Sequence, residues 1–525
     1  MTALTDDAPL SAGPPGTGPD PAASNHLRAR RLGIDTRQEA VVYMSRDCPV
    51  CRSEGFEAQS RVKVALDGTS VLATLNVVEP RFGILGDGEA GLSESAWRRL
   101  GAREGDQVTV SHPEPVASLS YLRRKMSGGR LGPRAMTEIV RDVVAGRYSE
   151  LHLSAFVAAC AGGGLDFDEV VSLTQAMVSQ GSRLTWGSRL VVDKHCIGGL
   201  LGNRTTPLVV AIAAAHGLTI PKTSSRAITS PAGTADVMET LAPVTLPVEH
   251  IRRVVERENG CIVWGGSVAL SPADDILIRI ERALDVDSPG QLVASVLSKK
   301  AAAGSTHVVI DIPWGPRAKI WTLDEAERLG RFFQGVGRMV GLDVGVAVSD
   351  GSQPIGRGFG PALEARDVLA VLQGAPDAPR DLRERGLAIA ARVLEFAPDV
   401  PAGAGLALAT RLLDDGRAWA KLQGICEAQG GLRTPPRARL THPVVAPAAG
   451  VVVDLDNRRL GRVAKFAGAP ANPAAGLVLH ARRGDAVAAG QPVFTIHAES
   501  RGELDYALAY AKKEGDVVKL EAARW

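Results

Sequence analysis

The spacing of hydrophobic and polar positions changes along the chain. Over residues 27–113, short runs of alternating polarity at 40–44, 62–66 and 108–110 are separated by Gly and Asp turns, which predicts a small β-rich domain. Within it, LSESAWRRLGAREGD (92–106) predicts a Ser-capped helix and a Gly-bearing turn into a strand over 107–111.

From residue 118 the apolar positions recur three and four residues apart, and each such segment ends in Gly. We therefore expect a helical domain over 114–190, rejoined by about 273–303. After residue 191, helices alternate with β-branched runs, of which THVVIDIPWG (306–315), preceded by a helix over 291–303, is the clearest buried strand. This alternation predicts an α/β sheet domain over 191–438.

The ends of the chain have different compositions. Strand-like runs broken by Gly, Asp and Pro turns predict a β-rich C-terminal lobe over 439–525. Residues 1–26 are rich in Pro and Gly and carry Asp6 and Asp7 where a secretory leader needs positive charge, which predicts a disordered tail. The predicted fold class is thus α/β: a helical domain and an α/β sheet domain, with a β-rich N-terminal domain and a β-rich C-terminal lobe.

Composition limits the partners of the protein. A chain of 525 residues exceeds what one hydrophobic core serves, so several domains are expected, with sites at their junctions. Its 60 Lys and Arg against 58 Asp and Glu leave a net charge of +2, so we expect neither nucleic acid nor membrane as a partner. Six cysteines without a leader indicate reduced thiols and a cytoplasmic protein.

A glycine-rich stretch offers a candidate phosphate site. In VVDKHCIGGLLGNRTTPLVVAIAAAHG (191–217), Lys194 and His195 precede a glycine turn, and Thr205 and Thr206 open an apolar helix. Glycines admit backbone N–H groups to an anion, and hydroxyls and a helix N-terminus add donors. The spacing matches neither the Walker pattern nor G-x-G-x-x-G, and glycines of this kind also occur in ordinary turns.

A second stretch, PKTSSRAITSPAGTADVMETL (221–241), gathers hydroxyls and an arginine before a helix: Ser224, Ser225, Arg226, Thr229, Ser230 and Thr234. These groups suit a tetrahedral oxyanion. A Ser/Thr-rich turn with a capped helix is the structural alternative. Two such loops in one predicted domain favour the anion site.

DKHCIGG, followed by SSRAITSPAGTADVME, resembles the signature region of the thymidine and pyrimidine-nucleoside phosphorylases. The resemblance runs from about residue 118 to 512 and includes ASVLSKKAAAG (294–304). The extra N-terminal β domain, GNRTT and KTSSRAITSPAGTAD are similar to the long form of the family, which includes archaeal nucleoside-monophosphate phosphorylases. A homodimer or higher homo-oligomer is also implied.

The resemblance implies roles for individual residues. Lys194, His195 and Lys299 would be catalytic. The phosphate would be held by Lys194, Cys196, Gly198, Gly199, Thr205, Thr206, Ser224 and Thr234. The base would be faced by His195, Arg226, Arg282, Ser295 and Lys299. Inorganic phosphate would be a co-substrate, and neither a cofactor nor a metal is expected.

Two positions depart from the family pattern. The family's phosphate-binding serine is Cys196 here, and a thiol is a poorer donor, so either a neighbouring N–H compensates or phosphate binds less tightly. Arg282 is closer in sequence to Ser295 than the family's arginine is to its serine.

Other candidate groups are interpreted as structural. Cys48 and Cys51 form a C-x-x-C without the further ligands that zinc needs. Asp274, after Pro272, is interpreted as a helix-capping acid, and GSQPIGRGFGPALEA (351–365) as a turn entering a helix. Three further cysteines among apolar neighbours are interpreted as packing residues: Cys160, Cys261 and Cys426.

Four functions remain open at this point. The leading hypothesis is phosphorolysis of thymidine to thymine and 2-deoxyribose 1-phosphate. Phosphorolysis of AMP, CMP or UMP to ribose 1,5-bisphosphate is the rival, with Arg204 as an extra ligand of the 5′-phosphate. Phosphoribosyl transfer would need a magnesium-holding acidic motif, which we do not identify. A non-catalytic nucleotide-binding regulator is disfavoured because Lys194, His195 and Lys299 are all present.

Overall fold

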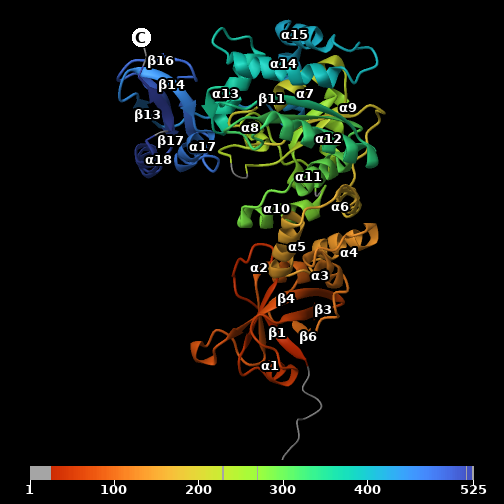
Figure 1. Ribbon diagram of the computed structural model, residues 1–525. Helices are drawn as coiled ribbons and strands as arrows, with labels where there is room; N and C mark the ends of the chain where they lie inside the picture. Colours follow the sequence, from red (N-terminus) through yellow and green to blue (C-terminus); the bar gives the residue numbers. More distant parts are fainter. Residues whose placement is uncertain (1–24, 228–229, 269, 516, 523–525) are drawn as a thin grey trace, which may run out of the picture. The chain divides into compact units, whose positions relative to one another are not determined.

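A computed structural model describes residues 25–227, 230–268, 270–515 and 517–522 (Figure 1). They form two compact units, one up to Ala117 together with Ala145–Leu153, the other comprising Ser118–Val144 and the chain from Ser154 onward. Of the tail expected over residues 1–26, residues 1–24 lie outside the described residues, and His26 already opens strand β1.

The first unit is built around a closed barrel of strand order β1-β5-β2-β4-β3-β6. Its elements are β1 (His26–Arg31), β2 (Val41–Ser45), α1 (Pro49–Glu54), β3 (Arg61–Leu66), β4 (Thr69–Val78), a 3-10 turn (Pro80–Phe82), β5 (Glu89–Leu92), α2 (Glu94–Leu100) and β6 (Gln107–Ser111). Alternate residues of β3 are buried, as the sequence pattern predicted. The Ser93 side chain accepts from the Ala96 N–H, which confirms the predicted helix cap.

Residues 145–153, which lie within the stretch expected to form the helical domain, pack with this barrel. Arg99 donates to the Ala145 carbonyl at 3.3 Å, and Arg61 donates to the Gly146 carbonyl at 3.3 Å. Tyr148 is buried among them. The backbone carbonyls at the end of a helix lack partners within the helix and need other donors. Here Arg99 and Arg61 of the first unit supply the donors for the carbonyls of Ala145 and Gly146.

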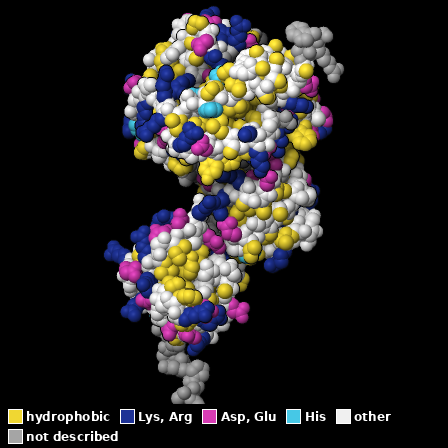
Figure 2. Space-filling model, turned by 90° about the vertical axis from the view of Figure 1, so that its left-hand side faces the viewer, with side chains coloured by type: hydrophobic (Ala, Val, Ile, Leu, Met, Phe, Trp, Pro, Cys, Tyr) yellow, Lys and Arg dark blue, Asp and Glu magenta, His cyan; other side chains and the backbone are white. Residues whose placement is uncertain are grey.

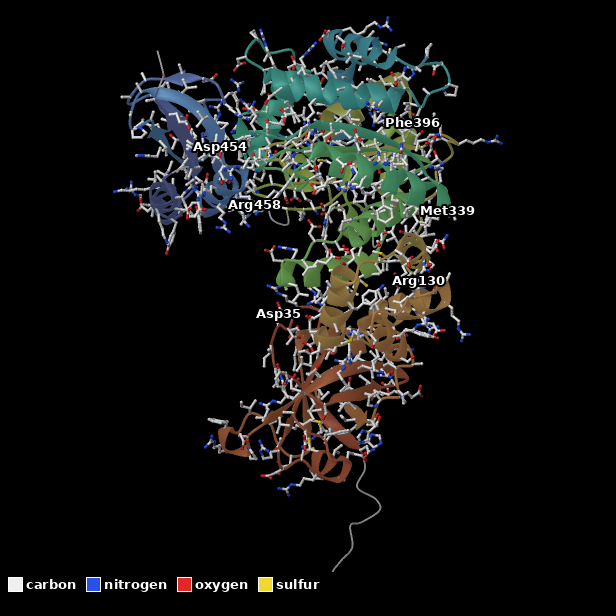
Figure 3. The ribbon with its side chains drawn as sticks, viewed as in Figure 1. Asp35, Arg130, Met339, Phe396, Asp454 and Arg458 are labelled. Atoms are coloured by element: carbon white, nitrogen blue, oxygen red, sulfur yellow. The ribbon has the colours of Figure 1, made fainter. Side chains whose placement is uncertain are left out.

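Helices α3 (Leu119–Met126), α4 (Pro133–Val144), α5 (Glu150–Gly162) and α6 (Phe167–Ser179) follow the predicted helical segments. Helices α10 (Pro272–Leu284) and α11 (Pro289–Ala302), far along the chain, pack against α4 and α6. Lys125 and Glu169 form a buried ion pair at 2.8 Å, and Arg130, marked in Figure 3, pairs with Asp166 at 2.5 Å.

The α/β domain has a parallel sheet, β11-β10-β7, beside a parallel pair, β8-β9. The strands are β7 (Val192–Cys196), β8 (Ile220–Ser224), β9 (Gly260–Trp264), β10 (His307–Trp314) and β11 (Asp343–Asp350). A parallel bridge between Val191 and Thr219 joins β7 to β8, so the five strands run in the order β11-β10-β7-β8-β9. Strand β10 confirms the predicted apolar strand.

Helices cover this sheet (Figure 1). They are α7 (Thr206–His216), α8 (Thr234–Glu239), α9 (Val248–Glu258), α12 (Leu323–Met339), α13 (Pro361–Leu372), α14 (Arg380–Leu394), α15 (Gly405–Asp414) and α16 (Arg417–Gln429). The core helix α7 is buried from Thr206 to Ala214, because α14, α15 and α16 pack around it. The ring of Phe396, marked in Figure 3, packs against that of His307 in a tilted arrangement, with ring centroids 4.9 Å apart.

The C-terminal lobe contains two small sheets, β12-β15-β17-β13 and β16-β14-β18. The strands are β12 (Gly358–Phe359), β13 (Leu440–Val445), β14 (Gly450–Leu455), β15 (Gly476–Leu479), β16 (Ala486–Val487), β17 (Pro492–Ala498) and β18 (Val518–Glu521). Helices α17 (Asn457–Phe466) and α18 (Arg501–Glu514) also belong to the lobe and were not predicted. The Ser500–Glu503 capping box of α18 was the overlooked signal.

The surface agrees with the near-neutral charge. Lys and Arg side chains are interspersed with Asp and Glu on the face shown in Figure 2. Among the described residues, no helix is both long and apolar enough to cross a bilayer.

Candidate active site

The predicted phosphate residues gather where neighbouring parallel strands end. Strand β7 ends at Cys196 and β8 ends at Ser224, and the two strands lie side by side. In open α/β sheets, ligands bind beyond the carboxyl ends of the strands. The two loops that the sequence predicts to bind an oxyanion therefore start from one edge of the same sheet.

Lys194 is a buried cation whose hydrogen-bond acceptors are hydroxyls. Its Nζ donates to Thr205 Oγ1 at 2.7 Å and to Thr206 Oγ1 at 3.3 Å, and its exposure is 1%. Burial lowers the pKa of Lys194. A buried ammonium is stabilised by a nearby negative charge, so this position suits an anion.

The turn between Lys194 and α7 depends on glycine. Gly198 and Gly199 have φ of +89° and +82°, a region that other residues rarely adopt. At Gly202, a Cβ would lie 2.0 Å from the carbonyl oxygen of Ile355. Glycine is needed at these positions to bring the chain back to the N-terminus of α7.

The second loop meets the first through Arg204. Its NH1 donates to Thr234 Oγ1 at 2.8 Å, and its NH2 donates to the Ala232 carbonyl at 3.0 Å. Because Arg204 precedes Thr205, this contact joins Thr234 to the segment that holds Lys194. The Ser224 hydroxyl, at the end of β8, is buried and has no hydrogen-bond partner within the described residues. Thr229 lies outside the described residues.

On the expected base side, Ser295 and Lys299 lie together on α11. Lys299 Nζ donates to Ser295 Oγ at 3.1 Å and to Asp274 Oδ2 at 2.8 Å. The interpretation of Asp274 as a helix cap is wrong, because its carboxylate is buried and pairs with Lys299 instead. Asp274 thus fixes the position of a residue expected to face the base.

Arg226 and Arg282 are placed differently from this pair. The Arg226 guanidinium binds Glu239 at 2.5 Å and Asp236 at 3.2 Å, and it lies 5.1 Å from the ring centroid of Trp264. Arg282 is exposed in the last turn of α10. Their roles in base binding stay predictions.

His195 lies next to a buried charge cluster. Asp193, with no exposed surface, binds Lys300 at 2.7 Å and Lys222 at 3.6 Å. Lys300 follows Lys299 on α11, and Asp193 lies on β7. The ion pair between Lys300 and Asp193 therefore brings the part of α11 that carries Lys299 close to β7. Burial, and then the positive charges of Lys300, Lys222, Lys299 and Lys194, hold the pKa of His195 well below its usual value.

His195 is therefore expected to stay neutral at pH 6–7. A long-range ¹H–¹⁵N correlation spectrum of the wild type should show a neutral imidazole there, assigned by the signal that His195→Asn removes. The unfolded chain binds this proton near pH 6.5 and the folded chain does not, so the free energy of unfolding should fall as the pH drops below about 6.5. A His195 signal half-protonated at pH 6.5 would contradict the prediction.

A second network of hydrogen bonds and ion pairs, centred on Asp311, holds the glycine-rich loop between β7 and α7. Asp311, buried on β10, accepts from Asn203 Nδ2 at 2.9 Å and pairs with Arg385 at 2.9 Å. Asn203 also donates to Cys196 Sγ at 3.1 Å. Burial raises the pKa of the Cys196 thiol to about 11, so the thiol keeps its proton for donation.

Sequence reasoning missed Asp193, Asp311 and Glu364, the last of which is buried and pairs with Arg204 at 2.6 Å. Each is a carboxylate in a largely apolar segment, and Asp311 stands inside the run VVIDIPW. Carboxylates are almost never fully buried unless paired, so a charged residue in such a run indicates a buried partner. The sequence does not say which cation that partner is.

The remaining motifs make contacts within the protein. Asp367 accepts from the backbone N–H groups of Arg357 and Gly358 at 2.6 and 2.8 Å. These two N–H groups of the loop at 351–365 are therefore already bonded within the protein. Cys48 and Cys51 are both buried and form no disulfide. The described residues contain no group of three His, Cys, Asp or Glu side chains arranged for a metal. Cys160, Cys261 and Cys426 are buried, as expected of packing residues.

Comparisons with family models match three parts of the chain. Residues 119–181 match the model "Glycosyl transferase family, helical bundle domain", 188–419 match "Glycosyl transferase family, a/b domain", and 451–517 match "Pyrimidine nucleoside phosphorylase C-terminal domain".

Relatives match over nearly the full length. A protein of Acidovorax sp. (strain JS42) named "Putative thymidine phosphorylase 2" is 61% identical over 95% of this chain and 97% of its own. The chain belongs to the thymidine and pyrimidine-nucleoside phosphorylase family. A "Putative thymidine phosphorylase" of Polaromonas sp. is 60% identical over 96% of this chain and 98% of its own. These phosphorylase relatives share the N-terminal domain, as the resemblance to the long form predicted.

Among solved structures, anthranilate phosphoribosyltransferase from Thermus thermophilus is similar to this phosphorylase family member at a TM-score of 0.48. It is 18% identical and covers 59% of this chain and 98% of its own.

Proposed function

We propose that this protein catalyses the phosphorolysis of a pyrimidine nucleoside, converting thymidine and inorganic phosphate to thymine and 2-deoxyribose 1-phosphate. The observation that carries the proposal is the buried Lys194 ammonium, bound to Thr205 and Thr206 and joined through Arg204 to Thr234. This arrangement concentrates positive charge and hydroxyl donors at the end of the sheet. The names of the relatives support thymidine as the substrate.

In the proposed reaction, a phosphate oxygen attacks C1′ while the bond from C1′ to the base nitrogen breaks. The base leaves with the bonding electron pair and takes up the proton that hydrogenphosphate loses. Positive charge develops at C1′ and negative charge on the base, so the phosphate faces the sugar while Lys299 stabilises the base. His195, held neutral, contributes hydrogen bonds to the base.

The rival hypothesis, in which the substrate is a nucleoside 5′-monophosphate, assigned Arg204 as a ligand of the 5′-phosphate. All three guanidinium nitrogens of Arg204 already donate to protein acceptors: Glu364, Thr234 and the Ala232 carbonyl. This favours the nucleoside.

One assay tests the proposal. The purified protein is mixed with inorganic phosphate and thymidine, uridine or AMP, and the released base is measured. Release from thymidine supports the proposal, and release from AMP alone would transfer the function to the rival. Release without phosphate would indicate a hydrolase, and no release from any substrate, with retained nucleotide binding, would indicate the regulator.

We further propose that the reaction needs no metal or other cofactor. The charges at C1′ and on the base are compensated by phosphate and by cationic side chains, so activity after dialysis against EDTA should match that of the untreated protein. A loss of activity restored by Mg²⁺ would contradict this prediction.

A further inference from the structure

The sequence suggested Arg204 only as a ligand of a 5′-phosphate, and its contacts indicate a different role. Arg204 lies between the glycine turn and Thr205, and its side chain is 11% exposed. Its Nε pairs with Glu364 Oε2 on α13 at 2.6 Å, and the other two nitrogens bind Thr234 and the Ala232 carbonyl. One planar guanidinium therefore connects three separate segments of the domain.

The direction of the hydrogen bond to Thr234 has a chemical consequence. A guanidinium only donates, so Thr234 Oγ1 is the acceptor and its own hydrogen is not used in this bond. Thr205 and Thr206 accept from Lys194 in the same way. Each of the three hydroxyls thus accepts from a cation. Thr205 Oγ1 in turn donates to Asn203 Oδ1 at 3.5 Å, whereas Thr206 and Thr234 keep their hydrogens for an oxyanion.

Glu364 holds the guanidinium in place. Its side chain is 2% exposed, and its Oε1 also accepts from the Gly360 N–H at 3.3 Å. A buried arginine needs such a counter-charge, and a planar guanidinium bonded to a carboxylate cannot turn freely. Arg204 is therefore fixed before any ligand arrives.

We propose that Arg204 is a positioning residue for the phosphate, which acts by locking the β7–α7 segment to the loop before α8 and by orienting the Thr234 hydroxyl as a phosphate donor. This inference rests on the proposed function and adds Arg204 and Glu364 to its phosphate site. It replaces the hypothesis that Arg204 binds a 5′-phosphate.

The test uses Arg204→Lys, which keeps the charge but cannot reach three acceptors with one nitrogen in the same plane. We expect the KM for inorganic phosphate to rise about tenfold or more, with less than a twofold change in the KM for thymidine at saturating phosphate. Glu364→Gln should shift the KM for phosphate in the same direction. Arg383→Lys, which alters an Arg–Asp pair on the surface of α14, is the matched control and should match the wild type.

A double-variant cycle separates positioning from a general structural role. If Arg204 acts through Thr234, then Arg204→Lys combined with Thr234→Ala should be little worse than the more damaging single variant. Additive effects would overturn the proposal. An unchanged KM for phosphate in Arg204→Lys, or a defect confined to AMP, would also overturn it.

Phosphate binding can be measured without turnover. Calorimetry with inorganic phosphate, at a temperature where circular dichroism shows both proteins to be folded, should show weaker binding to Arg204→Lys than to the wild type. Equal binding would overturn the proposal for Arg204. Failure of the wild type to release base from any nucleoside or nucleotide would instead overturn the proposed function, so the two failures are distinguishable.

Discussion

Replacing Lys194 with methionine is expected to lower kcat/KM for thymidine phosphorolysis by about two to three orders of magnitude, the usual cost of removing one group that stabilises charge in a transition state. Methionine approximates the length of the lysine side chain without its charge, so the buried position stays filled. The loss should appear as weaker phosphate use, because the ammonium lies among the hydroxyls that we propose to bind phosphate.

The control for this variant is Lys465→Met, an exposed lysine on α17 in the C-terminal lobe. It should retain wild-type kinetics. Initial rates over a range of phosphate concentrations give the comparison. A Lys194→Met enzyme with near-normal kcat/KM would remove Lys194 from the site, and with it the main support for the proposed function.

Replacing Asp193 with asparagine is expected to destabilise the α/β domain by about 3–5 kcal/mol, the effect of removing one partner from a buried ion pair. The carboxylate has no exposed surface and is the counter-charge of Lys300 and Lys222. Urea unfolding followed by tryptophan fluorescence measures the change, because Trp264 and Trp314 end two strands of this domain.

Two further variants test the cause of this destabilisation. Asp324→Asn, which removes an exposed partner of Arg328 on α12, should change stability by less than about 1 kcal/mol. Adding Lys300→Met to Asp193→Asn should recover part of the lost stability, because it removes one of the uncompensated charges. No recovery, together with a small effect of Asp193→Asn alone, would show that the cluster does not depend on this charge balance.

Helices and strands were predicted correctly where a single sequence pattern indicated them and no competing pattern lay beside it. Strand β10 is apolar along most of its length, and α2 begins at a serine cap, so both were predicted. Helix α18 was missed because strong strand signals on either side concealed its capping box. Asp274 was misinterpreted because Asp near a helix start usually caps it, whereas here its partner, Lys299, lies 25 residues away.

By itself, the sequence determined the family, the α/β fold class and the two loops that supply glycines and hydroxyls, because these depend on residue types and short spacings. Only the tertiary structure decided which charges meet. Lys300 reaches Asp193 across 107 positions, and Arg204 reaches Glu364 across 160. Such pairs form because a buried charge needs an opposite charge, and the folded sheet and helices determine which one lies within reach.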